Sequence, residues 1–284
     1  MIHSNAFASL KVPSMVMATL LVGCGASGPA DVGTPSANGA TANASDSAAA
    51  EARPAPESCE QGNGATCGHD AERILKSEGP KDPAYPIAQR GCELGDGRSC
   101  AIQGALTIEG IGVEKNVEAG IELVERGCQK DHPQACLILG AHAAKTNPTR
   151  MMEMFQRACS LGSGDGCYTL GRVYDGTENP VDQPAAVAAY SKGCNIQYGP
   201  ACRELAQHMF DGQGIEKSPE KALAVLEKNC AAKELDSCVM LGTTYFNGKD
   251  VKQDREKAAA ILKAACDAGS DLACRRGTVV NVLK

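Results

Sequence analysis

The chain contains 284 residues, of which 43% are hydrophobic and 22% are charged, and it has no Trp. This supply of apolar side chains is sufficient for a folded core, so the composition excludes a wholly disordered chain. The formal net charge of −6 argues against a nucleic-acid-binding protein, which would present a basic surface. The 15 cysteines are too many for an ordinary reduced cytosolic protein and point to an oxidising compartment.

Residues 1–24 have the features of a targeting segment. A short polar start is followed by an apolar stretch that is too short to span a bilayer, which needs about 20 residues. The stretch suits the core of a signal peptide. It ends in Leu21-Val22-Gly23-Cys24, which resembles a bacterial lipobox, in which the cysteine is acylated and anchors the protein to a membrane. The alternative is an ordinary secretory signal that ends in a cysteine by chance.

Residues 25–57 are rich in Ala, Gly, Ser, Pro and Thr and hold almost no bulky apolar side chain. We expect a flexible tether, with a coil span on the order of 30 Å, that joins the anchor to a folded domain at residues 58–284. The sequence thus predicts a protein of the bacterial cell envelope that meets the membrane through its lipid anchor only. Gly25 stands where Asp would be the usual signal for retention in the inner membrane. It favours the outer membrane, with the protein facing the periplasm or the cell surface.

The other 14 cysteines form seven pairs, and seven residues separate the two members of each pair. The pairs recur every 31 to 36 residues, and a fixed period of this length is the signature of a repeat protein. The pairs are Cys59 with Cys67, Cys92 with Cys100, Cys128 with Cys136, Cys159 with Cys167, Cys194 with Cys202, Cys230 with Cys238, and Cys266 with Cys274.

Each repeat predicts two helices. After the second cysteine, apolar or small residues recur three, four and seven positions on, as in Leu170, Gly171 and Tyr174, and this spacing places them on one helical face. The small residue four positions on would let a neighbouring helix approach closely. We expect these first helices to end in left-handed glycines, near Gly110, Gly176, Gly212 and Gly248.

The second helix of each repeat has an equally regular start. Twelve residues before the first cysteine of the next pair stand residues whose side chains cap a first helical turn. They are Asn116, Asn147, Asp182, Ser218 and Asp254. Only the first repeat, with Pro80 at this place, departs from the pattern.

Each cysteine pair therefore straddles the turn between two antiparallel helices, which brings its two sulfurs within bonding reach. We expect the first cysteine to close one helix and the second cysteine to open the next. The rival interpretation is metal ligation, but zinc sites favour shorter cysteine spacings and the sequence contains no C-x-x-C. Together with a secretory signal, the spacing favours seven disulfide bonds, one within each pair.

This pattern resembles the Sel1-like repeat family, the α/α solenoid relatives of tetratricopeptide repeats, and more closely its cysteine-rich branch, typified by the Helicobacter cysteine-rich proteins. The resemblance implies an all-α superhelical solenoid of about six repeats with a terminal capping helix. Members of the family act mainly as binding or adaptor proteins. The segments that carry the resemblance are GIGVEKNVEAGIELVERGC (110–128), GQGIEKSPEKALAVLEKNC (212–230) and GKDVKQDREKAAAILKAAC (248–266).

A curved solenoid leaves an extended groove suited to a peptide or protein segment. We expect the groove to be lined by positions one, two, five and six after the second cysteine of each pair. We therefore expect an exported, membrane-anchored protein that binds a protein or peptide partner, with no cofactor, no metal and no nucleic acid. The candidate groove residues are Tyr168, Arg172, Arg203, Gln207, His208 and Thr243.

The resemblance also supplies an alternative, because some cysteine-rich members are described as penicillin-binding or weakly β-lactamase-active. A serine β-lactamase needs an S-x-x-K motif with S-D-N and K-T-G elements. One S-x-x-K occurs, from Ser218 to Lys221, but Ser218 stands at a helix-capping place, and neither of the other elements is present. We therefore expect no catalytic residue, and a β-lactamase-like hydrolase remains the second hypothesis.

Histidines offer no clustered zinc site in the sequence after Cys24, because no two of them are near neighbours. His142 and His208 occupy equivalent places in repeats two apart, so we expect them about 20 Å from each other, too far to share a metal. We expect both to face solvent or the groove. The histidines in question are His69, His132, His142 and His208.

Overall fold

The computed structural model describes residue 59, residues 62–176 and residues 181–282. The expected signal peptide, Cys24 and the expected tether lie outside the described residues. Within the described part of the chain, no helix has both the length and the apolar character needed to cross a membrane.

The described residues form thirteen α-helices and no β-strand, so the predicted all-α class is confirmed. The helices make six consecutive pairs, from α2/α3 to α12/α13, and α14 follows the last pair. Their bounds are α2 (Gly64–Lys76), α3 (Ala84–Glu93), α4 (Gly97–Glu109), α5 (Val117–Gln129), α6 (Pro133–Ala143), α7 (Pro148–Ser160), α8 (Gly164–Asp175), α9 (Gln183–Asn195), α10 (Gly199–Asp211), α11 (Pro219–Ala231), α12 (Leu235–Asn247), α13 (Arg255–Asp267) and α14 (Asp271–Val282).

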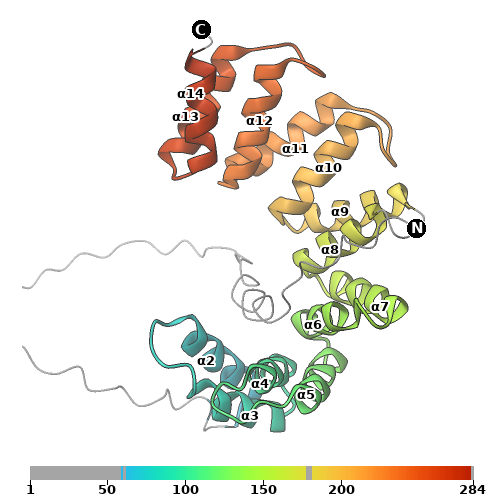
Figure 1. Ribbon diagram of the computed structural model, residues 1–284, viewed down its shortest axis with the longest axis vertical. Helices are drawn as coiled ribbons and strands as arrows, with labels where there is room; N and C mark the ends of the chain where they lie inside the picture. The colour runs from blue at the N-terminus through green and yellow to red at the C-terminus, as the bar shows by residue number, and fades with distance from the viewer. Residues whose placement is uncertain (1–58, 60–61, 177–180, 283–284) are drawn as a thin grey trace, which may run out of the picture.

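The helix pairs stack in chain order along an arc, from α2 at one end to α14 at the other (Figure 1). Each even-numbered helix packs against the next even-numbered helix, whereas among the odd-numbered helices only α7 and α9 make a comparable contact. Helices on the inside of a curve lie closer together than those on the outside. The even-numbered helices therefore form the concave layer, and the fold is the disulfide-bonded α/α solenoid that the cysteine pattern predicts.

Seven disulfide bonds close the corners between an odd-numbered helix, or residue Cys59 in the first case, and the even-numbered helix that follows. Each bond joins the two members of one expected pair, and the Cα–Cα distances lie between 4.4 and 4.8 Å. The bonds join Cys59 to Cys67, Cys92 to Cys100, Cys128 to Cys136, Cys159 to Cys167, Cys194 to Cys202, Cys230 to Cys238, and Cys266 to Cys274.

The second cysteine of each pair lies deeper in its helix than the sequence predicts. The expectation that it opens the helix is wrong, because it is the fourth residue of its helix in every corner. The reason is a tight turn: in the second corner only residues 94–96 separate α3 from α4, so α4 begins three residues before its cysteine. This constant register makes every corner the same structural unit. The seven fourth residues are Cys67, Cys100, Cys136, Cys167, Cys202, Cys238 and Cys274.

Each corner also contains one residue in the left-handed region, three positions after the first cysteine. In the second corner the Gly95 N–H donates to the Cys92 carbonyl (3.0 Å) and the next N–H, of Asp96, donates to the Gly91 carbonyl (3.0 Å). Both bonds satisfy carbonyls that the end of a helix leaves free. Glycine occupies the left-handed place in four corners, whereas the other three use a residue with a side chain. The seven residues are Gly62, Gly95, Asp131, Gly162, Gln197, Lys233 and Gly269.

The small residue four positions after the second cysteine permits the close approach that the sequence predicts. A Cβ atom added to Gly171 would lie 2.4 Å from Cε1 of Tyr190, and one added to Gly140 would lie 2.4 Å from Cε1 of Phe155. Tyr190 and Phe155 are buried, and each stands four residues before the next first cysteine. The two positions thus form one repeated contact between the helices of a pair.

The first helices end as expected in three of four cases. Gly110, Gly212 and Gly248 adopt positive φ angles of 78°, 72° and 64°. Gly176 does not, because its φ is −66° and its N–H donates to the Val173 carbonyl three residues back (3.3 Å). The expectation of a left-handed glycine at the end of α8 is therefore wrong, because α8 ends in a short-range bond that does not need one.

The five expected capping residues all occupy N-cap positions. Four of them accept a hydrogen bond from the backbone N–H three residues on, at 2.8 to 3.0 Å: Asn116, Asn147, Asp182 and Asp254. Ser218 stands at the N-cap of α11, but its side chain makes no capping bond. In the first repeat, α3 starts at Ala84 after Pro83, which has no side-chain cap.

The unused cap at Ser218 gives a test of stability. Because the side chain donates and accepts nothing in the first turn, we expect Ser218→Ala to change the free energy of unfolding by less than about 0.5 kcal/mol. The matched change Asp254→Ala removes a 2.8 Å capping bond and should cost about 1 kcal/mol. Chemical denaturation of both variants measures the difference. An equal loss in the two variants would show that Ser218 caps its helix in solution.

The corner disulfides give a second test. We expect the double variant Cys194→Ser, Cys202→Ser to lose about 2 to 3 kcal/mol, because the closed loop is short, and to loosen its own corner most. Hydrogen exchange should accelerate in α9 and α10 and remain nearly unchanged in α2 to α5. The double variant Cys92→Ser, Cys100→Ser is the matched control and should show the reverse distribution. Equal acceleration along the whole chain in either variant would contradict a stack of locally closed units.

Candidate functional site

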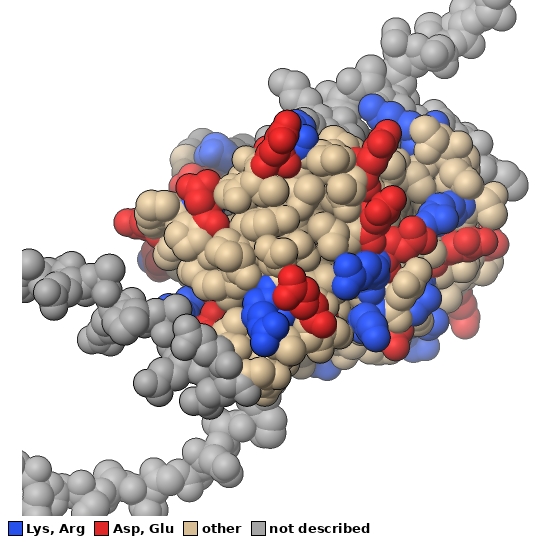
Figure 2. Space-filling view, turned by 90° about the horizontal axis from the view of Figure 1, so that it is seen from below, with Lys and Arg blue, Asp and Glu red and all other residues tan. Residues whose placement is uncertain are grey.

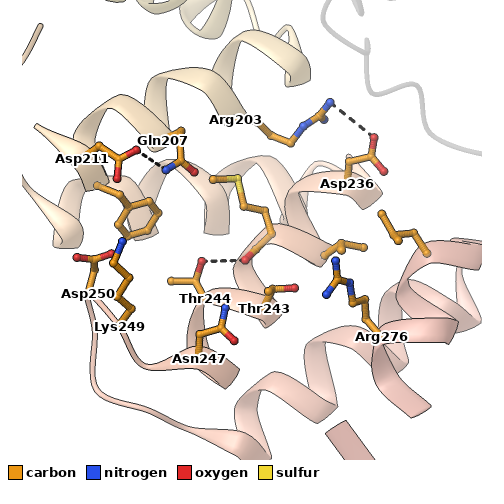
Figure 3. Close-up of a pocket in the computed structure, with 14 residues that line it drawn as sticks. Arg203, Gln207, Asp211, Asp236, Thr243, Thr244, Asn247, Lys249, Asp250 and Arg276 are labelled. Atoms are coloured by element: carbon orange, nitrogen blue, oxygen red, sulfur yellow. Dashed lines mark hydrogen bonds and ion pairs between the residues drawn. The ribbon is translucent and has the colours of Figure 1, made fainter. Parts of the chain in front are cut away.

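A cavity of about 570 Å³ lies between α10, α12 and α14. None of its lining residues comes from an odd-numbered helix, so it opens on the concave layer of the solenoid. We call it the inner groove; Figure 3 shows its lining side chains. They are Arg203, Gln207, Phe210, Asp211, Asp236, Val239, Met240, Thr243, Thr244, Asn247, Lys249, Asp250, Leu272 and Arg276.

The structure brings three of the six candidate residues together in the inner groove. Arg203 and Gln207 lie on α10, and Thr243 lies on α12. Two other candidates, Tyr168 and Arg172, lie outside it on α8, one repeat earlier. Nη1 of Arg172 donates to the Tyr168 hydroxyl (3.2 Å), so these two side chains form a pair of their own.

The sixth candidate, His208, is only 4% exposed and does not face the groove, so that expectation is wrong. Its Nδ1 lies 2.8 Å from the Gln213 carbonyl, and its Nε2 lies 2.9 Å from Oδ2 of Asp175. Both contacts are within hydrogen-bonding distance, so both ring nitrogens have a partner inside the protein. His208 thus ties α10 to α8 and to the loop after α10.

The buried Tyr190 joins this polar network, and the half-buried Tyr198 makes a similar bond to another carboxylate of α8. The Tyr190 hydroxyl donates to the same Asp175 oxygen (3.0 Å), and the Tyr198 hydroxyl donates to Asp165. Burial raises the pKa of Tyr190 and of Tyr198, and so does the carboxylate beside each. Both hydroxyls therefore keep their protons and act as donors, which makes the network a structural link between α8, α9 and α10.

The sequence reasoning missed several residues that line the groove. Asp211 and Asn247 stand nine positions after their second cysteine, one helical turn beyond the fifth position. The four-residue spacing that places the first and fifth positions on one face extends to the ninth, so this signal was present in the sequence. Lys249 and Asp250 lie in the loop after α12, where helical periodicity gives no guidance.

The carboxylates of the groove already have partners within the protein. Arg203 pairs with Glu234 and lies 3.6 Å from Asp236. Oδ1 of Asp250 accepts from Lys217 (2.9 Å). The third groove carboxylate, Asp211, accepts from Nε2 of Gln207 (2.6 Å).

Two cationic side chains of the groove, Lys249 and Arg276, have no such partner within the part of the chain that the structure describes. Among the described residues, neither Lys249 nor Arg276 makes a hydrogen bond or an ion pair. Figure 3 shows them on opposite sides of the cavity, with Thr243 and Asn247 between them. Lys249 and Arg276 are thus the charged groups of the groove that no described side chain bonds directly, whereas Asp211 is bonded by a neutral amide.

The remaining histidines occupy unrelated places. His132 is the N-cap residue of α6, and burial, with the nearby Arg98 guanidinium, lowers its pKa to about 4, so it is neutral near pH 7. His69 lies 2.9 Å from Nη1 of Arg98, and His142 is exposed on α6. The part of the chain that the structure describes contains no group of three potential metal ligands.

The end of the stack that holds α3, α4 and α5 carries interspersed charges of both signs (Figure 2). Ion pairs also join side chains of neighbouring repeats in this half of the stack. Nη1 of Arg98 contacts Glu72 at 2.9 Å, and Nη2 of Arg150 contacts Glu125 at 2.7 Å. The exposed Arg150–Glu125 pair contributes little to stability. The interspersed signs in Figure 2 leave no large field of one sign on the face that it shows.

A family model described as "Sel1 repeat" matches residues 105–132, 136–163, 199–228 and 235–270. Among solved structures, the chain is similar to a Sel1 repeat protein from Oxalobacter formigenes, with a TM-score of 0.57 and 21% identity. That match covers 72% of this chain and 86% of the other and shows the shared fold. Helicobacter pylori cysteine rich protein B is 28% identical over 45% of this chain and 97% of its own, with a TM-score of 0.38.

A curated relative, cytochrome c oxidase assembly factor 7 of Xenopus tropicalis, is 28% identical over 120 residues. That match covers 37% of this chain and 52% of the relative, so the chain spans about half the length of that protein. The family model and the shared fold identify Sel1 repeats, and seven disulfide bonds close the corners between the helices of this chain. The chain is a Sel1 repeat protein of the cysteine-rich, disulfide-bonded kind.

Proposed function

We propose that this protein is a non-enzymatic binding protein that holds an extended segment of a partner protein in the inner groove. The observation that carries the proposal is the cavity of about 570 Å³ that three consecutive concave-layer helices build together. Sel1 repeat proteins generally mediate contacts between proteins, and a concave solenoid surface suits an extended chain.

The lining of the inner groove fits a peptide. Phe210 and Val239 are buried, and Leu272 is 40% exposed, so the groove offers apolar contacts to a ligand side chain. Thr243 and Asn247 add hydroxyl and amide groups that can bond to a peptide backbone. Binding sites commonly combine an apolar floor with a few placed polar groups in this way.

We further propose that the protein works at the bacterial cell envelope, where a lipid on Cys24 holds it at the outer membrane. Support comes from the sequence Leu21-Val22-Gly23-Cys24, from the low-complexity segment 25–57 and from the seven disulfides, which need an oxidising compartment. A tether of that length would let the solenoid reach partners away from the lipid surface.

The binding proposal is tested by site-specific photo-crosslinking in cells. A photoreactive amino acid at Thr243 should give a discrete adduct with a partner protein, because this residue lines the groove. The same amino acid at Ala224, an exposed residue of α11, is the matched control and should not give that adduct. A synthetic peptide copied from the crosslinked segment should then bind the purified protein, and Thr243→Arg should abolish binding whereas Ala224→Arg should not.

Two outcomes would contradict the binding proposal. The first is a partner adduct that forms equally from Ala224 and from Thr243. The second is a crosslinked peptide whose affinity for the purified protein is unchanged by Thr243→Arg.

The anchorage proposal is tested by Cys24→Ser, which removes the sulfur that would carry the lipid. We expect this variant to move from the membrane fraction to the soluble fraction, whereas Ser27→Ala, three residues away, should stay with the membranes. Fractionation after a high-salt wash and mass analysis of the mature N-terminus give the measurement. Retention of the Cys24→Ser variant in the washed membranes would show that another feature holds the protein there.

A further inference from the structure

We infer that the segment bound in the inner groove is acidic, with two carboxylate side chains on either side of an apolar residue. This inference rests on the proposed function and adds to it the chemistry of the partner. The carboxylates belong to Asp or Glu side chains of the bound segment, not to its C-terminus. This chemistry follows from which charges in the groove have partners and which do not.

Each acidic residue of the groove already accepts a hydrogen bond or lies in an ion pair within the protein. Asp250 is paired with Lys217 at 2.9 Å, Asp211 accepts from Gln207 at 2.6 Å, and Asp236 lies 3.6 Å from Arg203. A basic ligand would have to displace or share one of these contacts. A basic segment would share each of these carboxylates with a group that is already bonded to it, so we expect it to gain less there than at a carboxylate without a partner.

Two basic residues of the groove are accessible to a ligand. Lys249 and Arg276 are exposed, and neither has a hydrogen-bonding or ion-pairing partner within the described residues. A ligand carboxylate can therefore bind either of them without breaking a contact in the protein. Arg276 can bind a carboxylate through two parallel N–H groups, which also fixes its orientation.

The geometry favours two acidic side chains in one segment. Lys249 follows α12 and Arg276 lies on α14, and the two stand on opposite sides of the cavity (Figure 3). The single carboxylate of a free C-terminus could meet only one of them. A chain that crosses the groove with an acidic residue at each side could meet both and place an apolar side chain against Leu272 and Val239.

The test is an unbiased selection. Random peptides displayed without a free C-terminus, and a parallel library with free C-termini, are selected on the purified, oxidised protein. We expect the first library to be enriched in sequences with Asp or Glu on both sides of an apolar residue. The best peptide, made with a C-terminal amide, should bind less tightly when either acidic residue is replaced by its amide.

Variants of the protein locate the interaction. Arg276→Gln and Lys249→Gln should each weaken binding of that peptide about threefold, and together roughly tenfold, as expected for partly exposed ion pairs. Lys221→Gln removes an exposed charge of α11 that does not line the groove, and it should leave the affinity unchanged. High ionic strength should weaken binding to the unmodified protein more than binding to the double variant.

Three results would overturn the inference. The first is enrichment of neutral or basic peptides, and the second is an acidic peptide whose affinity is unchanged by Arg276→Gln and by Lys249→Gln. The third is a preference for the library with free C-termini. If neutral peptides are enriched and Thr243→Arg abolishes their binding, the acidic preference fails while the proposed binding function stands. If no peptide is enriched from either library, the result counts against the acidic preference and against the proposed binding function.

Discussion

The corner between one helix pair and the next is the unit on which the rest of this solenoid depends. Its disulfide joins the last turn of one helix to the fourth residue of the following helix, and a left-handed residue between them reverses the chain. With four Phe, six Tyr and no Trp, the chain has few large side chains for its core. Covalent closure of each corner compensates for that shortage, because it restricts the unfolded chain and holds the end of one helix against the start of the next.

Packing between the helices of a pair follows from this fixed register. Once the corner sets the phase of both helices, a small residue four positions after the second cysteine meets a large residue four positions before the next first cysteine, as Gly171 meets Tyr190. Neither residue could be enlarged without forcing the helices apart. In α10 the first, fifth and ninth positions after the second cysteine instead line the inner groove, as Arg203, Gln207 and Asp211. These polar side chains lie outside the apolar core, so they can carry binding chemistry.

Much of the fold could be predicted from the sequence because each corner repeats the same local rules. The cysteine spacing predicted the bonds, and the capping residues located the starts of the second helices, as with Asn116 and Asp254. Prediction failed where a long-range contact decided the outcome. His208 stands at a place that periodicity assigns to the groove, but the carboxylate of Asp175 in the preceding repeat draws it into the core. Lys249 was not predicted to line the groove, because it lies in a loop where no helical periodicity indicates which way a side chain faces.

The local pairing of the cysteines has a consequence for how the molecule reaches its oxidised form. Fourteen cysteines could combine in very many ways, and most combinations would trap the chain in a misfolded state. Here each correct partner is only eight residues away, so its thiol meets the other at a far higher effective concentration than any cysteine of another repeat. Each corner could therefore oxidise as soon as it forms, in the order in which the chain emerges. Such a molecule has little need of an isomerase to correct wrong bonds.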